Sequence, residues 1–377
     1  MVKKLLCLLL LAVAGILSVP VSAQEATAQG TARSWLPSLT SYFQERYTDY
    51  ENQDDEWSLR RFKLLLDGDA SERITYHVQL FYKTNNNSGT DDKVYLKDAL
   101  ITFHASERSS VSVGRFKPPF GLERFQHDNV MDFMERTSVT NRLVVNGKLG
   151  SSFARDQGIQ ADFKNGHSRL SVGLFEGGGA NNAGKGNGPL GVARLIYKRA
   201  WKGGRWSKSL LCGGAVSLRH AGDLDLHSAL PGVSTSITGH FAGTDRRANL
   251  FARGELGPFS GQVEGIRLWL SPHNAGEIAA LGTYGQLTYR PVSKVLLGVR
   301  YERVHSDIHD NTVPVQWTWT YSVTSDLNNH LRLALDYSRS PSGRFLTPPN
   351  TWRFQVQYVL FRHLSPWTPP RRKRQEQ

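Results

Sequence analysis

Hydrophobic and polar residues alternate along much of the chain after residue 40. In residues 313–323 (VPVQWTWTYSV), one parity carries Val, Trp and Tyr, and the other carries Pro, Gln, Thr and Ser. The pattern recurs in 74–83 (ITYHVQLFYK), 331–338 (LRLALDYS) and 351–360 (TWRFQVQYVL). Successive side chains of a strand point to opposite faces, so each segment predicts a strand with one apolar and one polar face.

Sixteen segments predict strands, whereas helical patterns with caps are hard to find after residue 30. Strand ends predicted in this way are uncertain by about 2–4 residues. The segments lie near residues 40–50, 57–67, 73–83, 93–104, 109–116, 152–164, 167–176, 189–199, 208–219, 245–255, 259–270, 280–290, 293–304, 313–324, 329–338 and 350–361.

The connections between these segments alternate in length. Every second one is mostly tight, and the others are mostly longer and rich in Gly, Asn, Asp and Pro, as in 84–92 and 117–151. An even strand count with short turns at one end and long loops at the other is typical of an outer-membrane barrel. The alternative is a soluble periplasmic β-protein that binds sugar or anions. It would need two sandwich domains, and no linker separates the two halves.

The apolar face of residues 313–323 is therefore expected to touch lipid. Trp317, Trp319 and Tyr321 would lie near an interfacial girdle, where an amphipathic ring has one wet and one apolar side. We predict an all-β fold, a 16-stranded antiparallel transmembrane β-barrel.

The first residues predict export. Lys3 and Lys4 precede an apolar run over 5–17, and Val21-Ser22-Ala23 has the small residues of a cleavage site. The run is shorter than the ~20 residues of a membrane helix, so 1–23 is expected to be a signal peptide. We divide the rest into an N-terminal periplasmic segment (24–39), the barrel (40–361) and a basic, Pro-rich periplasmic tail (362–377).

Bulk composition resembles that of a soluble protein, with 39% hydrophobic residues and a mean hydropathy of −0.40. A transmembrane barrel hides its membrane character in such averages, because lipid-facing and lumen-facing residues alternate. The formal net charge of +13 suits nucleic acid, anionic headgroups or small anions. Export argues against nucleic acid, which leaves small anions and the lipid bilayer as expected partners. No catalytic or metal-binding constellation is apparent, so neither an enzyme nor a cofactor is expected.

The most distinctive motif is GRFKPPFGLE (114–123), followed by MDFMERT (131–137). Pro118 and Pro119 cannot donate ladder hydrogen bonds, so a strand should end there and the chain should leave the sheet stiffly. Together with SLRRFKLLLDG (58–68) and ARDQGIQADF (154–163), these motifs resemble the phosphate-selective porin O and P family. The resemblance covers roughly residues 40–361, in its second half by pattern alone.

The resemblance implies a 16-stranded outer-membrane barrel, as a rule a homotrimer, whose third extracellular loop folds inward to narrow an anion-conducting pore. The connection 117–151 falls where that loop should be, and Pro118, Pro119 and Gly121 would shape its path. The implied function is passive uptake of phosphate or related oxyanions, with polyphosphate as a possible substrate. A weakly selective general porin is the alternative. The chain departs from the family at its C-terminus, where the tail follows the last strand.

Anion pores place Arg or Lys where the conduit is narrow. In residues 58–68, the apolar positions Phe62, Leu64 and Leu66 share one parity, which should turn Arg61 and Lys63 inward. Arg60 shares the lipid-facing parity unless a bulge shifts the register. The resemblance favours the pair Arg60–Arg61 as pore residues.

Further pore candidates lie on the first strand and on the connection 117–151. Gln44 and Arg46 are expected to face the lumen, and the Arg60–Arg61–Lys63 cluster and the Arg115–Lys117 segment are expected to act at one level of the pore. For any one of these cations, a solvated surface or a headgroup contact is the alternative. The anion-pathway candidates are Arg46, Arg60, Arg61, Lys63, Arg115, Lys117, Arg136, Arg142 and Lys148.

Overall fold

The computed structural model describes the core of the chain. The described residues are 37–51, 53–83, 93–144, 155–179, 187–201, 207–225, 240–272, 277–308, 311–312, 315–340 and 350–361. The proposed signal peptide, the C-terminal tail and Lys148 lie outside these ranges. Among the described residues, no helix is long and apolar enough to cross a membrane.

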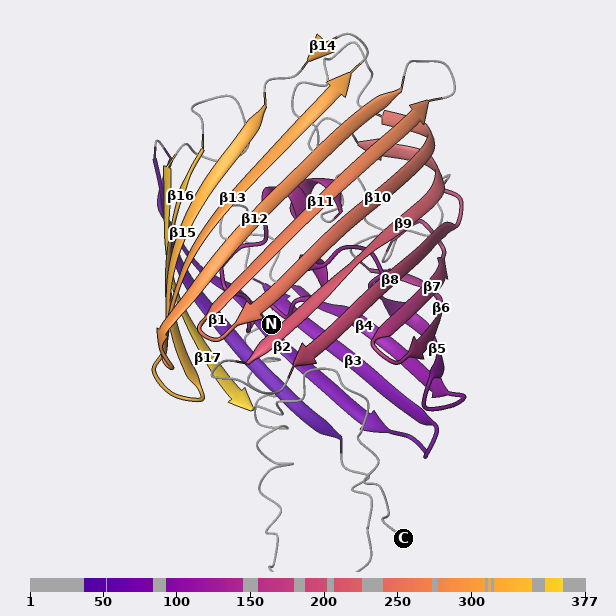
Figure 1. The fold of residues 1–377 in the computed structure, drawn as a ribbon, viewed down its shortest axis with the longest axis horizontal. Coiled ribbons are helices and arrows are strands. Elements are labelled where there is room, and N and C mark those ends of the chain that lie inside the picture. The colour runs from indigo at the N-terminus through magenta and orange to yellow at the C-terminus, as the bar shows by residue number, and fades with distance from the viewer. Residues whose placement is uncertain are drawn as a thin grey trace, which may run out of the picture.

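The strands form one antiparallel sheet that closes on itself, because β1 pairs with β17 as well as with β2 (Figure 1). Of the 17 strands in the described ranges, β14 has 2 residues and pairs only with the end of β13. β13 also pairs with β15, so the other sixteen strands make the wall. The predicted 16-stranded barrel is thus confirmed.

The wall strands have the following bounds: β1 Ser38–Tyr50, β2 Glu56–Asp69, β3 Ile74–Lys83, β4 Lys93–His104, β5 Ser109–Phe116, β6 Asp156–Asn165, β7 Ser168–Phe175, β8 Leu190–Trp201, β9 Lys208–Asp225, β10 His240–Leu256, β11 Phe259–Pro272, β12 Ile278–Val292, β13 Val295–Ile308, β15 Gln316–Asp326, β16 Leu331–Arg339 and β17 Asn350–Phe361. β14 is Asn311–Thr312, and two short helices, η1 (Glu123–Phe125) and α2 (Ser138–Leu143), lie between β5 and β6.

The largest departures from the predicted bounds are at β9 and β10. β9 continues to Asp225, past the predicted end at residue 219, and β10 begins at His240, before the predicted start at residue 245. In the extension His240 pairs with Asp225, and Thr244 pairs with His220. Gly, His and Asp give no strand signal there. The partner strand supplies the ladder hydrogen bonds that hold these residues extended, and composition does not predict them.

The two faces of β15 follow the predicted alternation. Trp319 and Tyr321 are 40% and 51% exposed, whereas Thr320 and Ser322 are 1% and 4% exposed. The aromatic residues therefore point away from the barrel and the small polar residues point into it. On the same outer face, Trp319 lies 4.8 Å from the ring of Tyr301 on β13, as expected for an interfacial aromatic belt.

Candidate functional site

Residues 117–144, here called the internal loop, follow β5 and include η1 and α2. Their polar groups contact side chains of β1, β2, β11, β13 and β16, which come from different parts of the wall. One segment reaches all these strands only from the space that the strands enclose. Figure 1 shows the loop within the ring of strands, behind β11 to β13 in that view.

The loop turns sharply just after it leaves the wall. Pro118 and Pro119 are buried, and Gly121 has φ 89°, a backbone conformation that residues with a Cβ rarely adopt. A Cβ at Gly121 would also lie 3.3 Å from Oε1 of Glu264 on β11. That carboxylate accepts hydrogen bonds from the backbone N–H groups of Leu122 at 2.8 Å and Glu123 at 3.2 Å. The turn thus presents two consecutive N–H groups to one wall carboxylate.

Two other wall carboxylates hold the loop farther along. Asp336 of β16 accepts the backbone N–H of Met134 at 2.9 Å. Glu302 of β13 accepts hydrogen bonds from both the backbone N–H of Ser138 and its hydroxyl, the latter at 2.6 Å. Charge-assisted hydrogen bonds of this kind are stronger than neutral ones, so the wall fixes the loop backbone at three separate places.

Apolar contacts complete this attachment. Val139 and Leu143 of α2 are fully buried, and Gly282 of β12 lies beneath them. A Cβ at Gly282 would come within 2.6 Å of Val139 Cγ1, and one at Gly298 of β13 would come within 2.9 Å of the ring of Phe133. Glycines on the inner wall therefore make room for the side chains of the loop.

The loop carboxylate Glu135 is shared by three wall arginines. Arg46 of β1 pairs with its Oε1, the Nη2 of Arg60 lies 2.8 Å from the same oxygen, and the Nη2 of Arg61 lies 3.9 Å from Oε2. Burial acts to raise the pKa of Glu135, but Arg60, Arg46 and Arg61 outweigh it and hold the pKa well below its ordinary value. Glu135 therefore stays ionised.

Asp128 of the loop has a similar environment. It pairs with Lys63 of β2 and with Arg136 of the loop itself, and Arg61 Nε lies 3.7 Å from it. Burial again acts to raise the pKa of Asp128, and Lys63, Arg61 and Arg136 together hold it well below its ordinary value. Across the two carboxylates, five different cations face two negative charges.

Arg60 and Arg61 both reach the lumen because β2 contains a bulge. Gln44 pairs with Arg61 and Glu45 pairs with Leu59, so Arg60 has no partner in this ladder. The extra residue shifts the side-chain parity, which brings two consecutive arginines to one face. From the sequence, Arg60 was expected to face the lumen only if a bulge shifted the register, and β2 contains that bulge.

Lys97 of β4 lies in a second bulge and was missed from the sequence. Gln79 pairs with Asp98 and Leu80 pairs with Leu96, which leaves Lys97 unpaired in the ladder. Its Nζ lies 4.8 Å from the ring centroid of Phe81, and Lys63 Nζ lies 5.8 Å from the same ring. Lys97 and Asp98 are two consecutive polar residues between apolar ones, as are Arg60 and Arg61. This break in the alternation indicates a bulge and could have identified Lys97 as a residue that faces the lumen.

Further cations lie near Lys97. Arg155, just before β6, is held by Asp98 with Nε at 3.0 Å from Oδ1. Lys117 donates to the backbone carbonyl of Arg124 at 3.3 Å, and the Arg194 guanidinium of β8 lies 4.5 Å from the ring centroid of Phe125. Positive side chains of β2, β4 and β8 thus face the same side of the loop.

The remaining candidates have different environments. Arg136 donates to the carbonyls of Glu123 and Gln126 at 2.8 and 2.9 Å in addition to Asp128, so it also cross-links the loop internally. Arg142 donates to the side chain of Gln316 on β15. Arg115 is half-exposed, in register with Ala99 and Gln157. The structure places Arg46, Arg60, Arg61, Lys63, Lys117 and Arg136 on or beside residues 117–136 of the loop.

Among the residues that the structure describes, no group of His, Cys, Asp and Glu side chains is arranged to hold a metal ion. Guanidinium, ammonium and carboxylate groups are prominent among the polar side chains that face the lumen, beside hydroxyls and amides. Such a surface can attract and hydrogen-bond a small oxyanion.

Comparison with known proteins identifies a family and a fold. The sequence profile of the family described as phosphate-selective porin O and P matches residues 40–342. No curated protein matches the chain. Among solved structures, an anion-selective porin from Comamonas acidovorans is 12% identical with a TM-score of 0.56, and the match covers 86% of this chain and 99% of that one.

Two other solved structures illustrate the same fold. The trimer form of OmpT, an outer membrane protein of Vibrio cholerae, is 12% identical with a TM-score of 0.59, covering 86% of this chain and 98% of that one. The outer membrane channel DcaP of Acinetobacter baumannii is 9% identical with a TM-score of 0.57, covering 86% and 96%. At these identities the similarity concerns the fold.

Proposed function

The chain belongs to the phosphate-selective porin O and P family, and on that premise we propose that this bacterial outer-membrane porin conducts anions in preference to cations. The proposal goes further and names phosphate or a related oxyanion as the permeant solute. Fold and family together make the protein a channel rather than an enzyme.

The observation that carries the proposal is the charge balance around Asp128 and Glu135. Five cations share these two carboxylates, so ion pairing leaves a positive surplus around residues 128–135 of the internal loop. Fixed charge in a narrow passage with low-dielectric walls is screened less than charge on an open surface. The surplus therefore raises the local concentration of anions.

We place the passage between the internal loop and the strands β3 to β6, beside the ion pairs that join the loop to β2. Glu264 and Glu302 tie the loop to the opposite side of the wall, on β11 and β13. Lys63 and Lys97 face the lumen on β2 and β4, beside the Arg155–Asp98 pair. An anion that passes there meets several cations in succession.

Phosphate or a related oxyanion suits this surface because guanidinium groups match its oxygens bidentately. Conduction also requires that each site releases the ion, and several moderate sites in series allow this better than one tight site. Arg60 and Arg61 share the single carboxylate of Glu135, so neither guanidinium has that carboxylate to itself. Each can exchange its contact with Glu135 for a contact with a passing oxyanion.

We further propose that the protein is a homotrimer and that residues 1–23 are cleaved on export. A solved structure with the same fold is the trimer form of a Vibrio cholerae outer membrane protein, which supports the trimer. Crosslinking of the protein in membranes, followed by denaturing electrophoresis, tests the assembly. Mass measurement of the mature chain tests cleavage after Ala23.

The function is tested in a planar bilayer with the purified porin. In a KCl gradient, the reversal potential should report preference for chloride, and added phosphate should reduce the chloride current. Preference for potassium would overturn the anion proposal. Chloride preference without phosphate block would instead favour a general porin with weak anion selectivity.

A further inference from the structure

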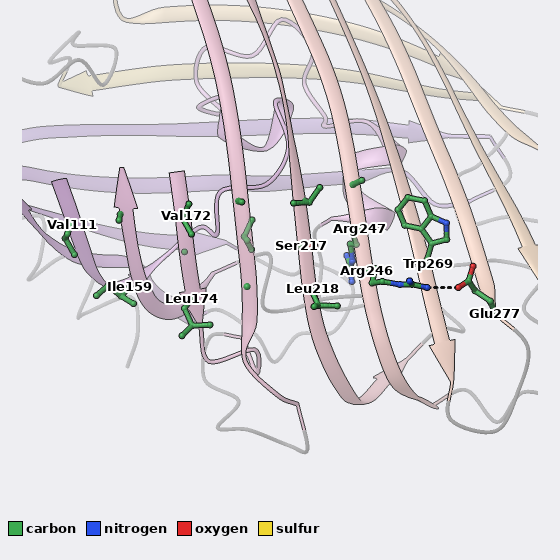
Figure 2. Close-up of a pocket in the computed structure, with 17 residues that line it drawn as sticks. Val111, Ile159, Val172, Leu174, Ser217, Leu218, Arg246, Arg247, Trp269 and Glu277 are labelled. Atoms are coloured by element: carbon green, nitrogen blue, oxygen red, sulfur yellow. Dashed lines mark hydrogen bonds and ion pairs between the residues drawn. The ribbon is translucent and has the colours of Figure 1, made fainter. Parts of the chain in front are cut away.

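The outer face of the wall has an apolar hollow over β5 to β11, with a volume of about 1190 Å³ (Figure 2). Ile159, Val172, Leu174 and Leu218 line it and are between 45% and 56% exposed. Exposed positions here alternate with buried ones such as Ser217 at 7%, so the hollow lies outside the lumen. Figure 2 shows Trp269 and the Arg246–Glu277 ion pair together at one end of the hollow.

A second, smaller hollow of about 570 Å³ lies on the same face and is lined by residues of β10 to β13, among them Gly265 and Gly285. The wall itself does not require these glycines. A Cβ at Gly265 would approach Thr283 Cγ2 no closer than 3.7 Å, and a Cβ at Gly285 would lie 3.6 Å from Val263 Cγ1, both ordinary contacts. Gly191, in the larger hollow, would meet its nearest atom only at 3.9 Å. Larger residues would fit, so the hollows are not a by-product of strand packing.

Three arginines point outward on the strands that carry these hollows. Arg246 of β10 is half-exposed and pairs with Glu277 at 2.8 Å. Arg267 of β11 lies between the buried Ile266 and Leu268 and has its guanidinium 5.8 Å from the ring centroid of Trp269. Arg303 of β13 is exposed, whereas both of its chain neighbours are buried.

All three arginines lie in the same half of the wall. β10 begins at His240, β11 ends at Pro272 and β13 ends at Ile308, and antiparallel pairing brings these ends to one edge. Residues 226–239, a long connection, join β9 to β10 at that edge. Long connections of outer-membrane barrels lie on the extracellular side, so the arginines face the outer leaflet near its headgroups.

A cation on the lipid face is costly in the hydrocarbon and tolerated near the interface, where it can contact headgroups. Glu277 partly offsets the charge of Arg246, so Arg267 and Arg303 carry most of the positive surplus. An amphiphile with an anionic head and acyl chains matches both features, because guanidinium groups bind phosphate bidentately and the hollows accept chains.

We propose that the outer wall over β5 to β13 binds a lipid of the outer leaflet whose phosphate headgroup carries a net negative charge. Its headgroup phosphates lie on Arg246, Arg267 and Arg303, and its acyl chains occupy the two hollows. This site is separate from the lumen and does not depend on the solute that the pore conducts.

The test measures lipid retention by the purified full-length porin with native mass spectrometry. The probes are phosphatidic acid and phosphatidylcholine with identical acyl chains. We expect retention of phosphatidic acid over phosphatidylcholine, and a fall of at least about tenfold in its affinity for the R267Q/R303Q variant, as expected on loss of charge-assisted hydrogen bonds. The G265L/G285L variant should lower retention by filling the smaller hollow.

The matched control is R199Q. Arg199 is also exposed on a strand, and its guanidinium lies 5.4 Å from the ring centroid of Trp201, but it is at the opposite edge of the wall. Equal loss of phosphatidic acid from R199Q and R267Q/R303Q would overturn the site, as would equal retention of both lipids. If G265L/G285L changes the oligomeric state and not lipid retention, the hollow is a contact with a second copy of the chain. Heat-shifted gel mobility confirms that each variant forms a barrel.

Discussion

Arg60 and Arg61 are consecutive residues of one strand, yet both guanidinium groups lie within 4 Å of the carboxylate of Glu135, at 2.8 and 3.9 Å. The bulge in β2 makes this possible, because it omits Arg60 from the ladder and returns the following residues to their usual faces. A short stretch of wall thereby presents twice the positive charge that alternation allows.

The R61E variant should lower the ratio of anion to cation permeability. A single sign of charge in a narrow cleft concentrates counter-ions by about tenfold or more, so reversal of one charge should change the ratio by up to that order. Reversal potentials in a KCl gradient give the ratio. R73E is the control, since Arg73 carries the same charge on an exposed turn. Equal effects of the two variants would place the filter elsewhere.

Lys97 should contribute to phosphate block as strongly as the cations found from sequence. K97E should weaken inhibition of chloride current by phosphate by about tenfold, the effect of losing one charge-assisted contact. K294E, in the exposed turn between β12 and β13, changes the net charge equally and should leave the block unaltered. If K97E conducts and is blocked like the wild type, the passage does not run along β4.

The D128N variant should increase single-channel conductance. Neutral Asn cannot hold Lys63 and Arg136 as Asp128 does, so the loop loses its ionic attachment to β2 at residue 128 and keeps the one through Glu135. The attachment through Glu264 is on the far wall and remains. D132N serves as the control, because the amide of Gln286, at 3.4 Å, is the only side chain in the described residues shown to hydrogen-bond the Asp132 carboxylate. Unchanged conductance in D128N would mean that other contacts hold the loop.

Acidification should leave the ion pairs of Asp128 and Glu135 with the wall intact through the pH range in which free carboxylates titrate. The pKa values of Asp128 and Glu135 are held below their ordinary values, so their contribution is present above the unfolded pKa and is lost only as the pH falls through the lower, folded pKa. Free Asp and Glu titrate near ~3.9 and ~4.3. Conductance should therefore stay constant from about pH 7 down to about pH 3.9, where a free Asp is half protonated. A step within that range that is absent from D128N would contradict this assignment.

Substitution of Gly282 should loosen α2 and spare the wall. A Cβ there meets Val139 Cγ1 at 2.6 Å, and overpacking of this kind costs about 1–3 kcal/mol. G282A should therefore raise open-channel noise and speed proteolysis within 117–144. G285A is the matched control on the same strand, because its Cβ would make an ordinary contact at 3.6 Å. Identical behaviour of the two variants would exclude a role for Gly282 in holding the loop.

The wall could be predicted from the sequence because alternation is a local property, and the bounds of most strands were correct. A bulge was considered at Arg60 because the apolar Phe62, Leu64 and Leu66 fixed the parity and put Arg60 on the lipid-facing side. Lys97 has the same local signature, but no family motif drew attention to it.

The anchors of the internal loop could not be predicted in the same way. Glu264, Glu302 and Asp336 are ordinary polar positions of alternating strands, and the loop residues that they hold lie more than 100 positions earlier in the chain. Such a contact depends on how far the chain curves before it closes, which periodicity does not encode. Pairing of Lys63 with Asp128 is likewise set by the folded path of the loop.

The contacts of the internal loop also have a mechanical consequence. Through Arg46 and Lys63 it is joined to β1 and β2, and through Glu264, Glu302 and Asp336 it is joined to β11, β13 and β16. A hollow cylinder flattens easily, whereas one with a crossbar resists ovalisation along the direction of the bar. The bar has its full set of anchors only when β16 is present, because Asp336 supplies one of them.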